Sequence, residues 1–311
     1  MDRLTVAAQG RSIGGIALFA FGLSACASLR PEVFHSFETS AAIAQKSLET
    51  EMARDVEWTR EADVDALAET KEAPLSNYML KEAKGYGWST PVVAPHWEAR
   101  LTLRALEDLN AAFLGYAKLL SRVADGHPNE AEENEALAQA INQNLRSAEN
   151  FNGQARKSPA LFPAEVSAFS CESLLRLGRS HRAKNLRKAV AENQPWVARY
   201  AAHCQTLIDL IRVDLKASYA NRMESIHTRW DDKRTPGRNT LAREIFNLNA
   251  EYADAMETLK ALSLFYAGLP AAHQALADGL ARSSKSPKAL ADLGTFAEQV
   301  ARLTRELEKS R

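Results

Sequence analysis

Two Glu-x-x-His motifs are the residues of this sequence whose types and spacing could bind a metal. They are Glu32-Val-Phe-His35 and Glu224-Ser-Ile-His227. Positions three apart share one face of a helix, and ferritin-like bundles use this pair in di-metal sites together with glutamates from two further helices. Glu32 lies six residues from Cys26, where we expect no core. We interpret both motifs as chance occurrences, and a metal-binding or enzymatic bundle that uses the Glu224/His227 face is the alternative function.

No other arrangement of nucleophiles, bases or glycine-rich loops in the sequence predicts catalysis. It contains no Gly-x-Ser-x-Gly, His-Glu-x-x-His or Cys-x-x-Cys motif and no glycine loop that would bind phosphate. His203 and Cys204 are adjacent, so on a helix their side chains point in different directions and do not form an activated pair. His181, His227 and His273 have no evident carboxylate partner. We therefore expect neither an enzyme nor a bound cofactor.

The first 25 residues have the three parts of an export signal. Arg3 and Arg11 lie in a short charged segment, residues 13–23 form an apolar stretch, and the small residues Ser24 and Ala25 follow. The apolar stretch is about half of the ~20 residues that a membrane-spanning helix needs. We therefore expect a cleaved signal peptide followed by a soluble chain.

The next residue completes a second pattern, because Leu23-Ser24-Ala25-Cys26 resembles the lipobox of bacterial lipoproteins. In that class the chain is cut before the cysteine, which then carries a diacylglycerol and an amide-linked acyl chain. The resemblance implies lipidation of Cys26. In that class an aspartate directly after the cysteine favours retention in the inner membrane. Because Ala27 stands at this position, the resemblance also implies that the protein is anchored in the outer membrane and faces the periplasm. The alternative is an ordinary secretory signal with a cysteine at the cut by chance.

These signals predict three regions: a signal peptide at 1–25, a lipidated tether at 26–32 and a helical bundle domain at 33–311. The whole chain has 39 basic and 39 acidic residues, and loss of Asp2, Arg3 and Arg11 leaves 37 and 38. A general nucleic-acid-binding protein is normally clearly basic. The near-neutral charge therefore argues against a nucleic-acid partner.

The mature part of the sequence has the pattern of long helices. Eleven prolines divide stretches rich in Ala, Leu, Glu, Lys, Arg and Gln, and we expect each proline to mark a helix start or stop. Strand patterns are absent except around residues 90–93. We expect helices at roughly 33–72, 75–84, 96–125, 129–151, 163–192, 195–233, 240–268, 270–282 and 287–309.

Apolar residues alternate at spacings of three and four in the stretches 106–123, 197–215, 241–266 and 293–307. A repeat of about 3.5 residues places one apolar seam along each helix and favours coiled-coil-like packing. Short connections make neighbouring helices antiparallel. The sequence therefore predicts an all-α fold, an elongated antiparallel helical bundle.

The mature chain keeps two further cysteines, Cys171 and Cys204, in a compartment that permits disulfides. If 163–192 and 195–233 form a hairpin that turns near residue 194, these cysteines lie 23 and 10 residues from the turn. The mismatch corresponds to about 20 Å along the helix axis, whereas a disulfide needs Cα atoms within about 7 Å. We predict two free, mostly buried thiols.

Two segments are candidate partner-binding surfaces. The first is a basic stretch without acids, with Arg176, Arg179, Arg182, Lys184, Arg187 and Lys188. It is interpreted either as a surface for lipid head groups, cell-wall polymer or an acidic partner, or as a solvated helix face partly balanced by the acidic helix 49–72. The second is the loop 85–95, where Tyr86 and Trp88 either contact a partner or cover the end of the bundle.

The sequence as a whole predicts a lipid-anchored binding or scaffold protein of the bacterial envelope. Lipid on Cys26 would hold one end, and the loop or the basic helix would meet a protein partner. A narrower form of this hypothesis is an immunity or inhibitor lipoprotein that caps an incoming toxin.

Overall fold

The computed structural model describes residues 31–69, 95–125, 131–154, 182–231, 237–279, 291, 295 and 298–305. All of these residues except Gly237 are helical, so the predicted all-α fold is confirmed for this part of the chain. The helices are α1 (Pro31–Glu69), α2 (Pro95–Asp125), α3 (Ala131–Gln154), α5 (Arg182–Asp231) and α6 (Arg238–Gly279), followed by a helical segment at 298–305. The predicted bounds of α1, α2 and α3 are right to within three residues.

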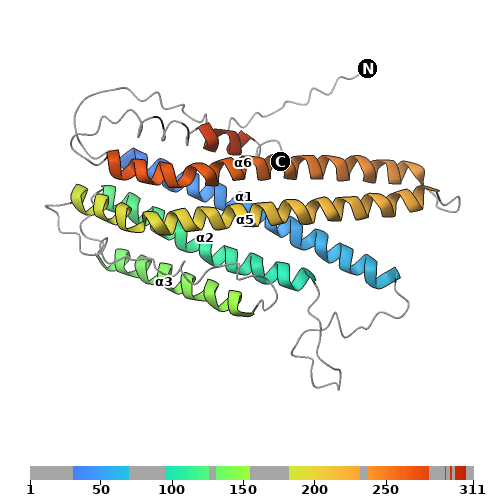
Figure 1. The fold of residues 1–311 in the computed structure, drawn as a ribbon, viewed down its shortest axis with the longest axis horizontal. Helices are drawn as coiled ribbons and strands as arrows, with labels where there is room; N and C mark the ends of the chain where they lie inside the picture. The colour runs from blue at the N-terminus through green and yellow to red at the C-terminus, as the bar shows by residue number, and fades with distance from the viewer. Residues whose placement is uncertain are drawn as a thin grey trace, which may run out of the picture.

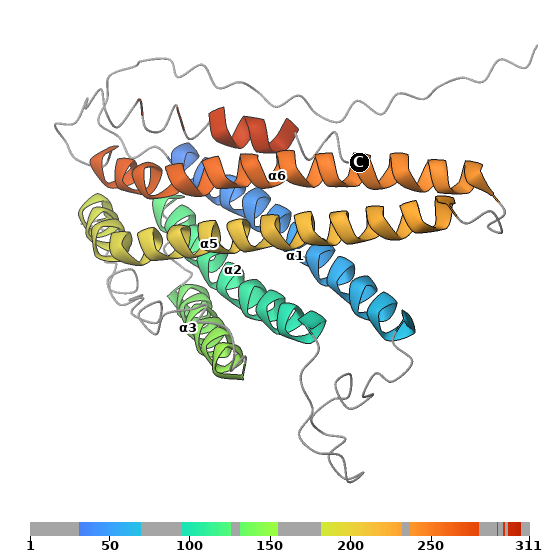
Figure 2. The ribbon, with the colours of Figure 1, turned by 45° about the vertical axis from the view of Figure 1, so that its right-hand side comes forward.

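The helices form an elongated bundle around one long hairpin. α5 and α6 run antiparallel side by side, and the 50 residues of α5 span about 75 Å (Figure 1). α1 and α2 form a second antiparallel pair that crosses this hairpin at an angle, and α3 packs against α2 (Figure 2). α1 begins at the end of the bundle at which α5 begins and α6 ends (Figure 1).

Two glycines are required by the positions they occupy. Gly237 precedes α6 with a φ of 105°, which L side chains rarely adopt, and its carbonyl accepts the backbone N–H groups of Thr240 and Leu241. Gly115 lies where α2 meets α3, and a Cβ atom there would come within 2.8 Å of the Ile141 Cγ1 atom. Glycine at this position allows the two helices to approach closely.

The predicted apolar seams make up the core. The seams of α2, α5 and α6 are buried at nearly every position that the spacing indicates, and both Leu109 and Ile208 are completely buried. Aromatic rings fill the centre: Phe113 stacks on Tyr200 with ring centroids 4.4 Å apart, and Trp196 stacks on Tyr200 from the preceding helical turn. Stacked rings add to the free energy of folding beyond the area they bury.

The predicted helix breaks at Pro195 and Pro270 are wrong, because both prolines lie inside continuous helices. A proline removes one backbone hydrogen bond and strains the preceding turn, at a cost of about 3 kcal/mol. Buried residues flank both prolines, with Trp196 after the first and Leu269 before the second, so packing on both sides holds each helix together. Tertiary contacts here outweigh the local effect of proline.

This continuity also removes the hairpin near residue 194 from which the cysteine prediction was made. Cys204 is free and completely buried in α5, as predicted, whereas Cys171 lies outside the described residues. Burial raises the pKa of the Cys204 thiol to about 12, so it is protonated at neutral pH and unreactive as a nucleophile.

Candidate functional site: an acidic groove between three helices

α1 places two carboxylates on the face that it buries against the other helices. Its buried apolar residues follow the same spacing of three and four as the other seams, and this spacing continues to Glu51 and Asp55. These two residues are only 3% and 2% exposed. Acidic residues are almost never buried to this extent unless they are paired, so each of them requires a physical account.

Glu51 has a partner of opposite charge. Its Oε2 atom accepts a hydrogen bond of 2.8 Å from the Nη1 atom of Arg54, one turn further along α1. Burial raises the pKa of Glu51 to about 7, while Arg54 lowers it and Asp254 on α6 raises it by smaller amounts. The ion pair with Arg54 offsets part of the free-energy cost of burying this carboxylate.

Asp55 differs from Glu51, because its Oδ1 atom is buried without a hydrogen-bond partner. The charge that acts on it most is negative, since Asp214 of α5 faces it across the helix interface. Burial, and to a smaller extent this neighbouring charge, raise the pKa of Asp55 from 3.8 to about 7. Partial burial also raises the pKa of Asp214. Two carboxylates thus share one region, and one of them has an unsatisfied buried oxygen.

Asp55 and Asp214 both line a groove of about 400 Å³ between α1, α2 and α5. Its apolar lining consists of Met52, Ala62, Ala99, Leu207, Leu210, Ile211 and Ala217, and its polar lining consists of Asp55, Thr59, Asp63, Thr102, Asp214, Ser218 and Asn221. None of the described residues that line it is basic. A groove with negative charge and apolar walls is suited to a cation that carries aliphatic groups.

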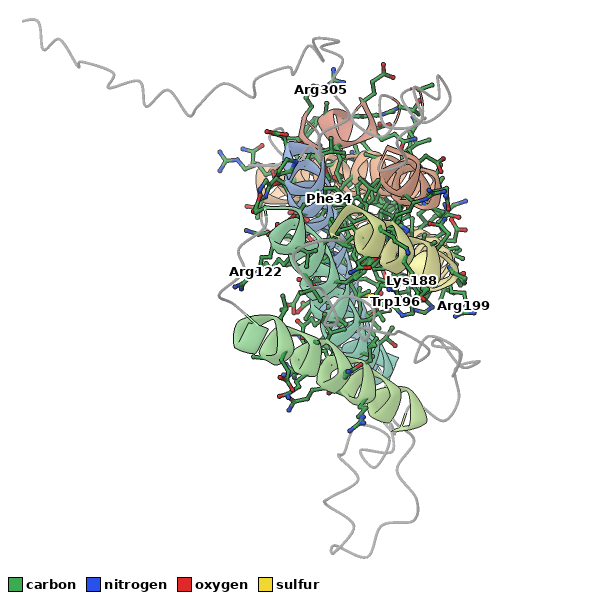
Figure 3. All side chains as sticks on the ribbon, turned by 90° about the vertical axis from the view of Figure 1, so that its left-hand side faces the viewer. Phe34, Arg122, Lys188, Trp196, Arg199 and Arg305 are labelled. Atoms are coloured by element: carbon green, nitrogen blue, oxygen red, sulfur yellow. The ribbon has the colours of Figure 1, made fainter. Side chains whose placement is uncertain are left out.

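The basic stretch found in the sequence lies elsewhere on the molecule. Arg182 opens α5, and Lys184 and Arg187 are exposed near the end of the bundle at which α1 begins. Lys188 is 65% exposed and forms an ion pair of 3.5 Å with Glu192; Figure 3 shows it on α5 at this end, together with Phe34 of α1. Such an exposed pair contributes little to stability.

Several other predicted site residues lie outside the described residues: Cys26, Tyr86, Trp88, Arg176 and Arg179.

The two Glu-x-x-His motifs lie at opposite ends of the bundle (Figure 1), one in the first turns of α1 and the other near the end of α5. His35 contacts the Oδ1 atom of Asp125 at 2.9 Å, and His227 lies 3.4 Å from Asp231 with 77% of its side chain exposed. The motifs therefore do not combine into one di-metal site. Within the ranges that the structure describes, no group of three His, Cys, Asp or Glu side chains is arranged to hold a metal ion.

His273 belongs to a buried hydrogen-bond network that joins α2, α5 and α6. The Tyr116 hydroxyl donates to Nε2 of His273 at 2.7 Å, and Nδ1 of His273 donates to Oε1 of Gln194 at 2.6 Å. The Gln194 amide in turn donates to the carbonyl of Pro270 at 2.9 Å. Burial lowers the pKa of His273 to about 3, so the ring is neutral at physiological pH. This arrangement fixes the helices and contains no nucleophile.

No family model matches this chain, and no curated protein or solved structure is significantly similar to it. Among the helices in the described ranges, none combines the length and the apolar character required to cross a bilayer.

Sequence reasoning missed Asp55, Glu51 and Asp214, although one signal was present. Continued at spacings of three and four, the apolar seam of α1 reaches Glu51 and Asp55. An acid at a seam position indicates a buried carboxylate, because seam positions face neighbouring helices. Asp214 gives no such signal, since it is an exposed residue of α5 outside the apolar seam.

Proposed function

We propose that this protein is a lipid-anchored binding protein of the bacterial envelope that faces the periplasm from the outer membrane. Lipid on Cys26 attaches the chain, and the bundle presents a binding groove to a protein partner. The observation that carries the proposal is the groove around Asp55 and Asp214, because it is open, about 400 Å³ in volume and lined by a buried aspartate that has one oxygen without a hydrogen-bond partner. No catalytic step is assigned to it.

The distance between the anchor and the groove fits a tethering mechanism. Pro31 lies five positions after Cys26, so this tether spans at most about 17 Å. Asp55 lies 24 residues beyond Pro31 along α1, which corresponds to about 36 Å. The groove is thus up to about 50 Å from the lipid, which allows a partner in the periplasm to reach it.

The anchor is tested with the substitution Cys26→Ser in cells. We expect the variant to move from the membrane fraction to the soluble fraction and to lose metabolic labelling by an alkynyl fatty acid, because the thioether site is gone. Cys171→Ser is the matched control and should remain membrane-bound and labelled. If Cys26→Ser stays in membranes after a carbonate wash, the lipobox interpretation and the proposed anchoring are wrong.

A further inference from the structure

We propose that the groove around Asp55 and Asp214 binds a basic side chain, the ammonium of lysine or the guanidinium of arginine, presented by a protein partner. The protein source of this cation rests on the proposed function, whereas the chemistry of recognition rests on the groove alone. The cation would meet the Asp55 carboxylate, and its aliphatic stem would lie against the apolar walls.

One carboxylate oxygen of Asp55 is unsatisfied. A buried polar atom without a partner costs about 1–3 kcal/mol, and more when it is charged. The side chain of Asp55 is 2% exposed, and its Oδ1 atom has no hydrogen-bond partner. The nearby Arg54 donates its hydrogen bond to Glu51 and not to Asp55. Because this atom is closed to solvent, a cation in the groove acts on the Asp55 carboxylate through its charge and supplies the missing counter-charge.

The charges around Asp55 are also negative. Asp214 on α5 faces Asp55, and Asp63 of α1 also lines the groove, whereas Glu51 is paired with Arg54 and is not part of the lining. Like charges in a partly buried site repel one another, and a bound cation removes that repulsion. The same carboxylates disfavour an anionic ligand.

The lining of the groove fits both the stem and the charged end of a basic side chain. Leu207, Leu210 and Ile211 offer an aliphatic wall, and Lys and Arg side chains bury their methylene stems along such surfaces while the charged end reaches polar groups. The hydroxyls and amide at Thr59, Ser218 and Asn221 can accept the remaining N–H donors, since an ammonium has three and a guanidinium has five. A volume of about 400 Å³ is in the range of sites for organic groups and far exceeds what a bare ion fills.

The test is a peptide titration of the purified full-length protein in detergent at pH 8, in which binding is measured by isothermal titration calorimetry or NMR. The probes are a short peptide with one central lysine and the same peptide with that lysine Nε-acetylated, so that stem and shape are kept and the charge is lost. We expect saturable binding of the charged peptide and at least about tenfold weaker binding of the acetylated one. Equal binding of the two peptides would overturn the proposal.

Three variants locate the binding. Asp55→Asn should weaken binding of the lysine peptide about 30-fold or more, because removing one member of a buried charge pair costs several times the energy of an exposed pair. Asp214→Asn, at an exposed position where folding is not in question, should weaken it to a smaller extent. Asp209→Asn is the matched control, since that carboxylate is on the same helix, is 72% exposed and contacts Arg212. Unchanged binding in both Asp55→Asn and Asp214→Asn would contradict the proposal.

Three further outcomes test this inference, and the last two of them separate it from the proposed function. If cadaverine binds as tightly as the lysine peptide and competes with it, the recognition of a protein side chain is wrong. If Cys26→Ser remains membrane-bound but the lysine peptide binds at Asp55, the anchor is wrong and the groove inference holds. If Cys26→Ser is released but no peptide binds to the intact protein, the anchor holds and the groove inference is wrong.

Discussion

The substitution Asp55→Asn should change the pH dependence of stability in a direction that the structure fixes. Burial and the charge of Asp214 raise the pKa of Asp55 from 3.8 to about 7 in the folded chain. Between these values the folded state holds a proton that the unfolded state has lost, so the free energy of unfolding falls as pH rises. The contribution of Asp55 is fully present below pH 3.8 and is lost as the pH passes 7. Asparagine has almost the same shape and does not titrate.

The magnitude follows from the linkage between protons and folding. Each pH unit between 5 and 7 lowers the free energy of unfolding by about 1.4 kcal/mol for one such group, so the total from pH 5 to pH 8 is roughly 3 kcal/mol. Glu51 contributes in the same direction, because its pKa is also about 7. His203 and His273, whose pKa values burial lowers to about 4 and about 3, act in the opposite direction below pH 6.5. Only the difference between variant and wild type isolates Asp55.

The assay is urea denaturation of the purified full-length protein at pH 5, 6, 7 and 8, with unfolding monitored by far-ultraviolet circular dichroism. Relative to wild type, Asp55→Asn should gain about 3 kcal/mol of stability from pH 5 to pH 8. The control Asp209→Asn should show a difference that does not vary with pH, because that carboxylate is exposed. A difference between Asp55→Asn and wild type that is constant with pH would refute the burial of an unpaired carboxylate at this position.

Three further predictions concern other parts of the molecule. Tyr116→Phe removes the donor to Nε2 of buried His273 and should lower the free energy of unfolding by about 1–3 kcal/mol in the same urea assay; an unchanged midpoint would contradict the network. Gly115→Val should lower it by about 1–3 kcal/mol, because the new side chain overlaps Ile141, and no loss would contradict the close approach of α2 and α3. The charge of the basic stretch is reversed in the triple variant Arg179→Glu, Arg182→Glu and Arg187→Glu. This variant should no longer capture the partner in a pull-down, while its circular dichroism spectrum stays unchanged. Intact capture would mean that the stretch is only a solvated helix face.

The bundle itself could be predicted from the sequence because packing of long helices depends on a one-dimensional pattern. The spacing of Leu109 and Phe113 in α2, or of Cys204 and Ile208 in α5, identifies the buried face without knowledge of the neighbouring helix. The breaks at Pro195 and Pro270 could not be judged in this way. Whether a helix continues through a proline depends on how well both flanks are packed, and that is a property of the tertiary structure.

The groove could be predicted only in part, for the same reason. A run such as 176–188 is visible as local composition, whereas the groove joins residues from three distant segments, Asp55 on α1, Thr102 on α2 and Asp214 on α5. The seam position of Asp55 is readable from spacing alone. That Asp55 has an oxygen without a hydrogen-bond partner cannot be predicted from the sequence, because such a prediction requires the positions of all neighbouring donors.

We propose that a partner inserts a basic side chain into this groove while the protein is anchored in the envelope. The most direct test places the photocrosslinking residue p-benzoylphenylalanine at Leu210, which lines the groove and is 45% exposed, in living cells. The account predicts an adduct with one protein, joined at a segment that contains lysine or arginine. This adduct should be lost with Asp55→Asn, kept with Asp209→Asn and absent when the crosslinker is placed at Phe246 on α6, which is 75% exposed. An adduct that persists with Asp55→Asn, or that forms equally from Phe246, would contradict the account.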